Sequence, residues 1–205
     1  MSYGTFARLA RDPSLPFGKR VSNLRSCVQL YRPLGFHATL DFLESRAGHF
    51  QRDEGALLRA LAEIDASRAA WQRELASYAL VRRAAKRAGQ RSPRRDERNP
   101  HLCDRWHAAP REGALHAVRF AHRRLPGPAA PGLDHLVAVC LAAGGRLDAE
   151  GLAALAAYRS ALLESRTVAL YEDASAWRRA DAELAVCHRI ALAAELPAPA
   201  APGAG

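Results

Sequence analysis

The sequence predicts an all-α fold, an irregular helical bundle with two long helices. Of the 205 residues, 44 are alanine and 28 are arginine. Both are strong helix formers, whereas the β-branched residues that favour strands are few. Long stretches without proline or glycine carry apolar residues three and four positions apart, which is the period of an amphipathic helix. Prolines and glycines gather between these stretches, where they would end the helices.

Three short helices are expected before the first long one. They should span residues 4–11, about 21–31 and about 39–47. Residues 12–18 hold two prolines and a glycine, which favour a turn after the first helix. Pro33 and Gly35 should end the second helix. Thr39 is predicted to cap the third helix, and Gly48 to end it.

The first long helix is predicted over about 56–88, a stretch with neither proline nor glycine. Asp53 can cap its first turn, and Glu54 suits the positive end of the helix dipole. The apolar positions are Leu57, Leu61, Ile64, Trp71, Leu75 and Tyr78. At 1.5 Å per residue the helix would be about 50 Å long, so it should pair with another long helix or project as a coiled coil. Arg68 and Arg82 lie on the same seam, which argues against a strict dimeric coiled coil.

The chain is expected to divide into four regions. These are an N-terminal helical region over 1–88, a basic linker over 89–111, a C-terminal helical region over 112–196 and a disordered tail over 197–205. Three residue–proline pairs in the linker disfavour helix, at Pro93, Pro100 and Pro110. The tail consists of proline, alanine and glycine, a composition typical of disorder.

The C-terminal helical region should begin with short helices at about 112–124 and 133–143, separated by a Pro- and Gly-rich break. Asp148 can cap the second long helix. No proline or glycine occurs over 152–196. The sequence therefore predicts that this helix runs without interruption from about 149 to 196.

The net charge of +9 is unevenly distributed, and six of the nine charges lie in residues 82–98. The eight basic residues of this basic segment are Arg82, Arg83, Lys86, Arg87, Arg91, Arg94, Arg95 and Arg98. The negative end of a helix dipole stabilises two or three cations, by about 0.3–1 kcal/mol each, but not those beyond Gly89. We therefore predict that the basic segment binds a polyanion, and a solvated linker is the alternative.

The polyanion is predicted to be an acidic protein surface. Binding to single-stranded nucleic acid is typically supported by aromatic side chains that stack on the bases, and none occurs between residues 82 and 105. Nonspecific contacts with RNA or DNA phosphates are the alternative. Arg119, Arg123 and Arg124 would then add to the basic segment.

The sequence predicts no catalytic, cofactor or metal site. It contains no Gly-rich phosphate loop, nucleophile elbow or zinc-protease motif. His101, Cys103 and His107 are close in sequence, but zinc sites typically use paired cysteines. We therefore expect a non-enzymatic interaction or scaffold protein that makes helix-mediated contacts with other proteins. An enzyme with an unrecognised site is a distant alternative.

The composition favours an intracellular protein, cytoplasmic or nuclear. The four cysteines are widely spaced, and no signal-peptide pattern or bilayer-spanning apolar run is visible. Residues 1–40 contain six basic residues and one acid. That composition resembles a mitochondrial transit peptide, so the mitochondrion is the alternative location.

Overall fold

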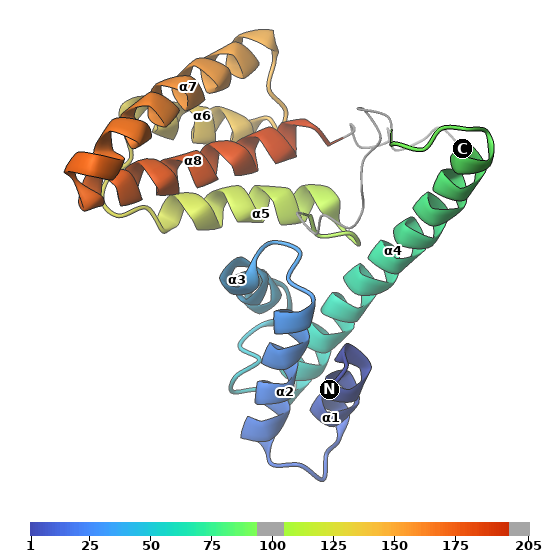
Figure 1. Cartoon of the computed structure of the whole chain (residues 1–205). Coiled ribbons are helices and arrows are strands. Elements are labelled where there is room, and N and C mark those ends of the chain that lie inside the picture. Colours follow the sequence, from blue (N-terminus) through green and yellow to red (C-terminus); the bar gives the residue numbers. More distant parts are fainter. Residues whose placement is uncertain (94–104, 197–205) are drawn as a thin grey trace. The chain divides into compact units, whose positions relative to one another are not determined.

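The computed structural model describes residues 1–93 and 105–196, with the backbone alone for residues 170–172. Regular secondary structure in these ranges is entirely helical, which confirms the predicted fold class (Figure 1). The helices are α1 (Tyr3–Arg11), α2 (Phe17–Leu30), α3 (Phe36–Ala47), α4 (Glu54–Arg87), α5 (Pro110–Arg123), α6 (Pro131–Ala142), α7 (Ala149–Glu172) and α8 (Ala174–Ala194). They form two compact units, unit 1 over Met1–Ala109 and unit 2 over Pro110–Gly205.

The core of unit 1 lies between the first half of α4 and the three short helices α1, α2 and α3. The side chains that α4 buries there are Ala56, Leu57, Ala60, Leu61, Ile64 and Ser67. They follow the three- and four-residue spacing of the sequence, because one face of the helix meets its neighbours. As predicted, Asp53 caps α4, with a carboxylate oxygen that accepts a hydrogen bond from the Ala56 amide.

The start of α3 differs from the prediction. The helix begins at Phe36, after Gly35, whose φ of 89° allows the chain to turn. Thr39 therefore does not cap α3 but lies inside its first turn, fully buried. Its hydroxyl oxygen accepts a hydrogen bond from the Leu34 amide, at 3.3 Å. Gly35, which was predicted to end the second helix, instead immediately precedes the start of α3, and α2 ends earlier, at Leu30.

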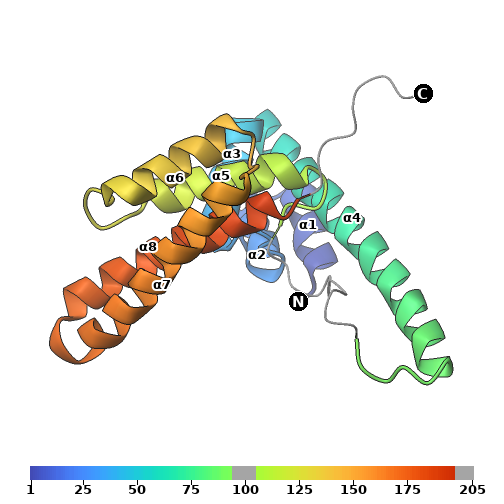
Figure 2. The same ribbon diagram turned by 90° about the horizontal axis from the view of Figure 1, so that it is seen from above.

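The second half of α4 extends beyond α1, α2 and α3 (Figure 2). After Ser67, the only side chain of this helix that is buried is Arg82. Leu80 is 63% exposed and Val81 is 58% exposed. The helix ends where Gly89 adopts a φ of 88° and the Gln90 amide donates to the Ala85 carbonyl, at 2.9 Å. No described residue tests whether this half of α4 joins a coiled coil, which stays a prediction.

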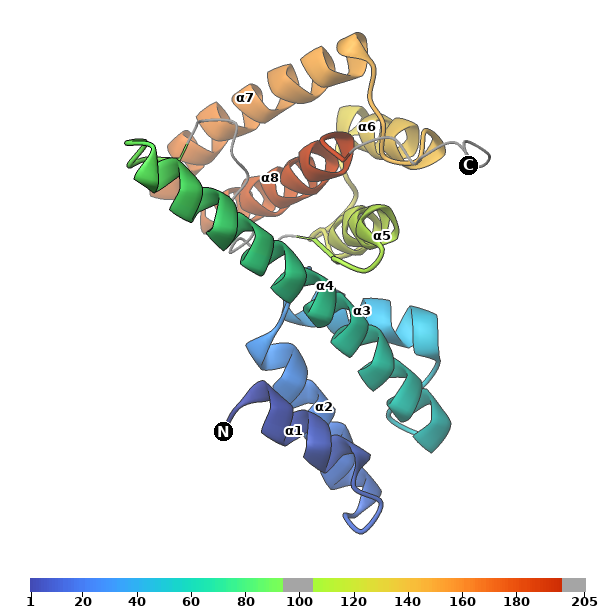
Figure 3. The same cartoon turned by 90° about the vertical axis from the view of Figure 1, so that its right-hand side faces the viewer.

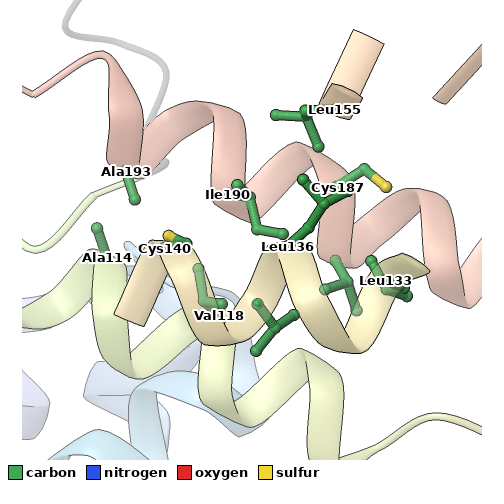
Figure 4. Close-up of a cluster of buried hydrophobic side chains, with 11 residues drawn as sticks. Ala114, Val118, Leu133, Leu136, Cys140, Leu155, Cys187, Ile190 and Ala193 are labelled. Carbon is green, nitrogen blue, oxygen red and sulfur yellow. The ribbon is translucent and has the colours of Figure 1, made fainter. Parts of the chain in front are cut away.

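Unit 2 is built around α8, which packs against α5, α6 and α7. Its core side chains come from all four helices and include Val118, Leu136, Leu155 and Ile190 (Figure 4). The connection between α6 and α7 begins at Gly144 and Gly145, whose φ values are 62° and 90°. A side chain at either position would be strained at such positive φ.

The predicted helix over 149–196 is wrong, because the structure breaks it at Asp173. This residue is extended, with φ −148° and ψ 106°, and separates α7 from α8. Its amide ends α7 by donating to the Ala169 carbonyl, at 3.0 Å. Its carboxylate starts α8 by accepting from the amides of Ser175 and Ala176, at 2.7 and 3.2 Å. An aspartate side chain thus stops a helix without proline or glycine, because it supplies acceptors for the next helix start.

The break allows α7 and α8 to fold against each other as a hairpin (Figure 2). The Tyr158 hydroxyl of α7 donates to the Glu183 carboxylate of α8, at 2.7 Å. Near the turn, Arg166 lies 3.1 Å from the Asp181 carboxylate and 5.4 Å from the Trp177 ring centroid. Burial of the apolar faces of both helices stabilises this arrangement over a straight helix, at about 25 cal/mol per Å² of apolar area.

Candidate polyanion site

The structure describes five of the eight residues predicted to bind a polyanion. Arg83, Lys86, Arg87 and Arg91 are exposed, whereas Arg82 is buried. The other three, Arg94, Arg95 and Arg98, lie outside the described residues. The four exposed cations occupy the last two turns of α4 and the chain that follows the helix.

Arg82 is 8% exposed and binds the protein's own backbone. Its Nη2 atom donates to the carbonyl oxygens of Gln90 and Arg91, at 3.4 and 2.9 Å. These carbonyls follow the turn at Gly89, so the guanidinium fastens the chain that leaves α4 to the helix. The sequence placed Arg82 among the anion ligands, but its burial and these bonds identify a structural role for the side chain.

Arg83, Lys86 and Arg87 form an exposed cationic group at the end of α4. Residues three and four apart are neighbours on a helix surface, so Arg83 and each of the other two side chains repel by a few tenths of a kcal/mol. Lys86 and Arg87 lie in the last turn, where the helix dipole offsets part of that repulsion. Leu80 is exposed three residues before Arg83 and on the same side of the helix, so apolar surface adjoins the cationic group.

After the basic segment, the chain returns to α4 at Arg105. Arg105 Nη2 lies 2.5 Å from Glu74 Oε2, and His107 Nδ1 lies 3.3 Å from Glu74 Oε1. The His107 amide donates to the Ser67 hydroxyl of α4, at 3.0 Å. Trp106 between them is fully buried, with its ring centroid 4.8 Å from that of Phe42. We refer to residues 105–107 as the strap.

The strap makes the basic segment part of a loop that is held to α4 at both ends. Glu74 lies 13 residues before Arg87, which corresponds to about 20 Å along the helix axis. The predicted linker over 89–111 is thus divided, because residues 105–109 belong to unit 1 and α5 begins at Pro110. The whole basic segment therefore belongs to unit 1.

Burial lowers the pKa of His107 below the ordinary histidine value, although the Glu74 carboxylate beside it acts in the opposite direction. His107 is therefore neutral at neutral pH. Partial burial raises the pKa of Glu74, but contacts with His107 and Arg105 outweigh this and lower it overall. Sequence reasoning missed this cluster because Glu74 and Arg105 are 31 residues apart.

The three arginines expected to extend a nucleic-acid site belong to unit 2. Arg119, Arg123 and Arg124 are exposed at and just after the end of α5. The Arg124 guanidinium lies 5.7 Å from the ring centroid of Phe120, which it can contact by a cation–π interaction. The basic segment and these arginines are thus carried by different units.

The cysteines in the described ranges, Cys27, Cys140 and Cys187, are buried and form no disulfide. Burial raises the pKa of Cys27 to about 12 and that of Cys187 to about 11, and it also raises the pKa of Cys140. These thiols are therefore protonated at neutral pH and poor nucleophiles. No three His, Cys, Asp or Glu side chains gather as metal ligands anywhere in the ranges that the structure describes.

No protein-family model matches the chain, and neither a curated protein nor a solved structure matches it. Over the described helices, none is both long enough and apolar enough to cross a membrane.

Proposed function

We propose that this is a non-enzymatic interaction protein of the scaffold type, which binds an acidic protein surface through the basic segment. The observation that carries the proposal is the exposed end of α4, where Arg83, Lys86 and Arg87 adjoin the exposed side chain of Leu80. The same half of α4 extends beyond the other helices of unit 1, so a partner can approach it.

Electrostatics supports an anionic partner. Arg83, Lys86, Arg87 and Arg91 lie within nine residues, and no described ion pair neutralises any of them. A concentration of one charge sign raises the association rate of an oppositely charged surface. Three of the four are arginines, whose guanidinium groups bind carboxylates with two parallel hydrogen bonds.

The neighbouring apolar side chain of Leu80 favours a protein as the partner over a nucleic acid. Leu80 would gain stabilisation by leaving water at a protein interface, about 25 cal/mol per Å² buried. Contacts with phosphates would leave this side chain in water. Trp106, the first aromatic residue after the basic segment, is fully buried and cannot stack on a base.

Two labelled probes test the proposal with the full chain. One is a glutamate-rich helical peptide with leucine on one face, and the other is a duplex DNA of unrelated sequence. Fluorescence anisotropy over a salt series should show binding of the peptide. Glutamine at Arg83, Lys86, Arg87 and Arg91 should abolish that binding, and Leu80→Gln should weaken it.

The matched control replaces Arg8, Lys19, Arg25 and Arg52 with glutamine. It removes the same number of exposed arginines and lysines from unit 1, away from the end of α4, and should leave peptide binding nearly unchanged. If the protein binds DNA but not the peptide, with a steep salt dependence and no effect of Leu80→Gln, the partner is a nucleic acid and not a protein. No binding of either probe at about 50 mM salt would overturn both versions of the site.

A further inference from the structure

The helix α7 is apolar on nearly all sides in its first half. Between Gly151 and Leu163 its only charged residue is Arg159. Leu155 and Ala169 are buried, on the side that packs against α8 and α6. A helix that is apolar all round is normally covered all round. In unit 2, α7 lies along an edge, with its other side turned away from α8 and α6 (Figure 3).

The uncovered side carries a regular seam. Its members are exposed and alternate at spacings of three and four residues, namely Ala153, Ala156, Ser160, Leu163 and Thr167. This outer seam has the spacing of the apolar positions in a coiled coil, and its small residues would allow a second helix to approach closely. Leu163 within the seam and Leu152 beside it are 43% and 47% exposed. A helix that packs on the seam would cover both of these apolar side chains.

Two charged residues, Arg159 and Glu164, flank the outer seam on opposite sides. They are five residues apart, about 140° around the helix, so they cannot pair within α7. Neither forms an ion pair with any residue that the structure describes. Between two parallel helices in register, however, the position of Arg159 on one helix faces the position of Glu164 on the other.

The signs of these charges also choose the orientation of the partner. In an antiparallel pair related by a two-fold axis, each flank faces the same flank of the other copy, so Arg159 of one copy cannot face Glu164 of the other. In a parallel pair, each flank faces the opposite one, and both Arg159–Glu164 contacts form. The charges thus favour a parallel pair, in which both contacts form, over an antiparallel one, in which neither does.

We propose that α7 of a second copy of this chain covers the outer seam, in a parallel pair with two-fold symmetry. One helix face buries less than the roughly 800 Å² per partner of a standard interface, and alanine contributes little area. The pair is therefore weak, with a Kd on the order of tens of micromolar. This inference is independent of the anionic partner proposed for the basic segment, because it uses a different unit.

Sedimentation velocity of the full chain over a range of concentrations tests the pair. Wild-type protein should form a concentration-dependent dimer. Arg159→Glu or Glu164→Arg alone should weaken it by about tenfold, since like charges then meet, and the two changes together should restore it. Arg178→Glu, on the exposed surface of α8, is the matched control and should leave the dimer unchanged.

Cysteine cross-linking then tests the orientation. Ala153→Cys should form a disulfide with its own copy under mild oxidation, and so should Thr167→Cys, with the wild-type protein as the control for the native thiols. Cross-links between the two variants in a mixture would show an antiparallel pair and overturn the proposed orientation. A monomer at several hundred micromolar, or a double charge reversal that folds but does not dimerise, would overturn the proposal itself.

Discussion

The guanidinium of Arg105 lies 2.5 Å from the Glu74 carboxylate, which brings the chain back to α4 after the basic segment. Both side chains are about one-third exposed, so the ion pair itself contributes at most about 1 kcal/mol. Its consequence is structural, because it lies next to the buried Trp106 and orients the strap on α4. The basic segment is thereby part of a closed loop of unit 1.

Trp106→Ala should destabilise unit 1 by about 3–5 kcal/mol, the usual loss when a buried tryptophan is truncated. The side chain is fully buried against Phe42, so its removal leaves a cavity that the surroundings fill only in part. Hydrogen exchange of the amides of α3 and α4 measures the effect within unit 1. A change of less than about 0.5 kcal/mol in the free energy of unfolding is typical of a residue in a solvated linker. That result would contradict the packing of the strap in unit 1.

The stability of unit 1 should fall as the pH is lowered below about 6.5, because His107 is buried in its neutral form. Its folded-state pKa is depressed, so the unfolded chain takes up the proton first. The contribution of neutral His107 to stability is complete above the pKa that this histidine has in the unfolded chain. As the pH falls from there to the pKa of His107 in the folded protein, the contribution is lost at up to about 1.4 kcal/mol per pH unit. Glu74, whose pKa is also lowered, adds a loss in the same direction at more acidic pH.

Urea unfolding from pH 7.5 to 5.5 tests this dependence, with the midpoint as the readout. His107→Gln removes the titrating group and should flatten the profile over this range. His49→Gln is the control, because His49 is exposed and lies 2.8 Å from Glu44 at the surface. An equally steep profile in His107→Gln would assign the pH dependence to another group.

Arg82→Gln and Arg83→Gln should differ, although each removes one positive charge from adjacent positions. Arg82 is buried and donates to two backbone carbonyls, so its loss should cost about 1–3 kcal/mol and loosen the turn after α4. Arg83 is exposed, and its replacement should change stability by less than about 0.5 kcal/mol. Limited trypsin digestion of the folded protein measures the difference, as the rate of cleavage in the chain that follows α4. Equal rates in the two variants would show that Arg82 does not fasten this chain to the helix.

Asp173→Ala should destabilise the α7–α8 hairpin by about 1 kcal/mol, because α8 loses its capping carboxylate. Asp173→Asn keeps a capping oxygen and should retain most of the stability. Thermal unfolding followed by circular dichroism compares the variants. If alanine and asparagine have the same effect, the side chain of Asp173 does not determine where the helix breaks.

Much of the fold was predictable because its signals are local. The start of α4 after Asp53 depends on one side-chain cap, and its end depends on Gly89, whose positive φ suits glycine. The break at Asp173 was not predictable in the same way. Aspartate is tolerated inside a helix, and it becomes a cap here because the folded hairpin buries the facing sides of α7 and α8.

The candidate site shows the same division. The exposure of Arg83, Lys86 and Arg87 follows from their position at the polar end of a long amphipathic helix. Arg82 has the same chemistry and the same neighbours in sequence, but it is buried on the turn after Gly89. The sequence could not separate these arginines, because burial depends on which helix face meets the returning chain.

The sequence by itself determined the helical class, most helix positions, the excess of charge in the basic segment and the apolar character of α7. Capping, backbone propensity and hydrophobic period act over a few residues, so a linear chain displays them. The tertiary structure alone decided that α7 and α8 fold back at Asp173 and that Arg105 meets Glu74. These contacts join residues far apart in sequence, and they form only because burial of Trp106 and of the α7–α8 faces outweighs the entropy of closing the loops between them.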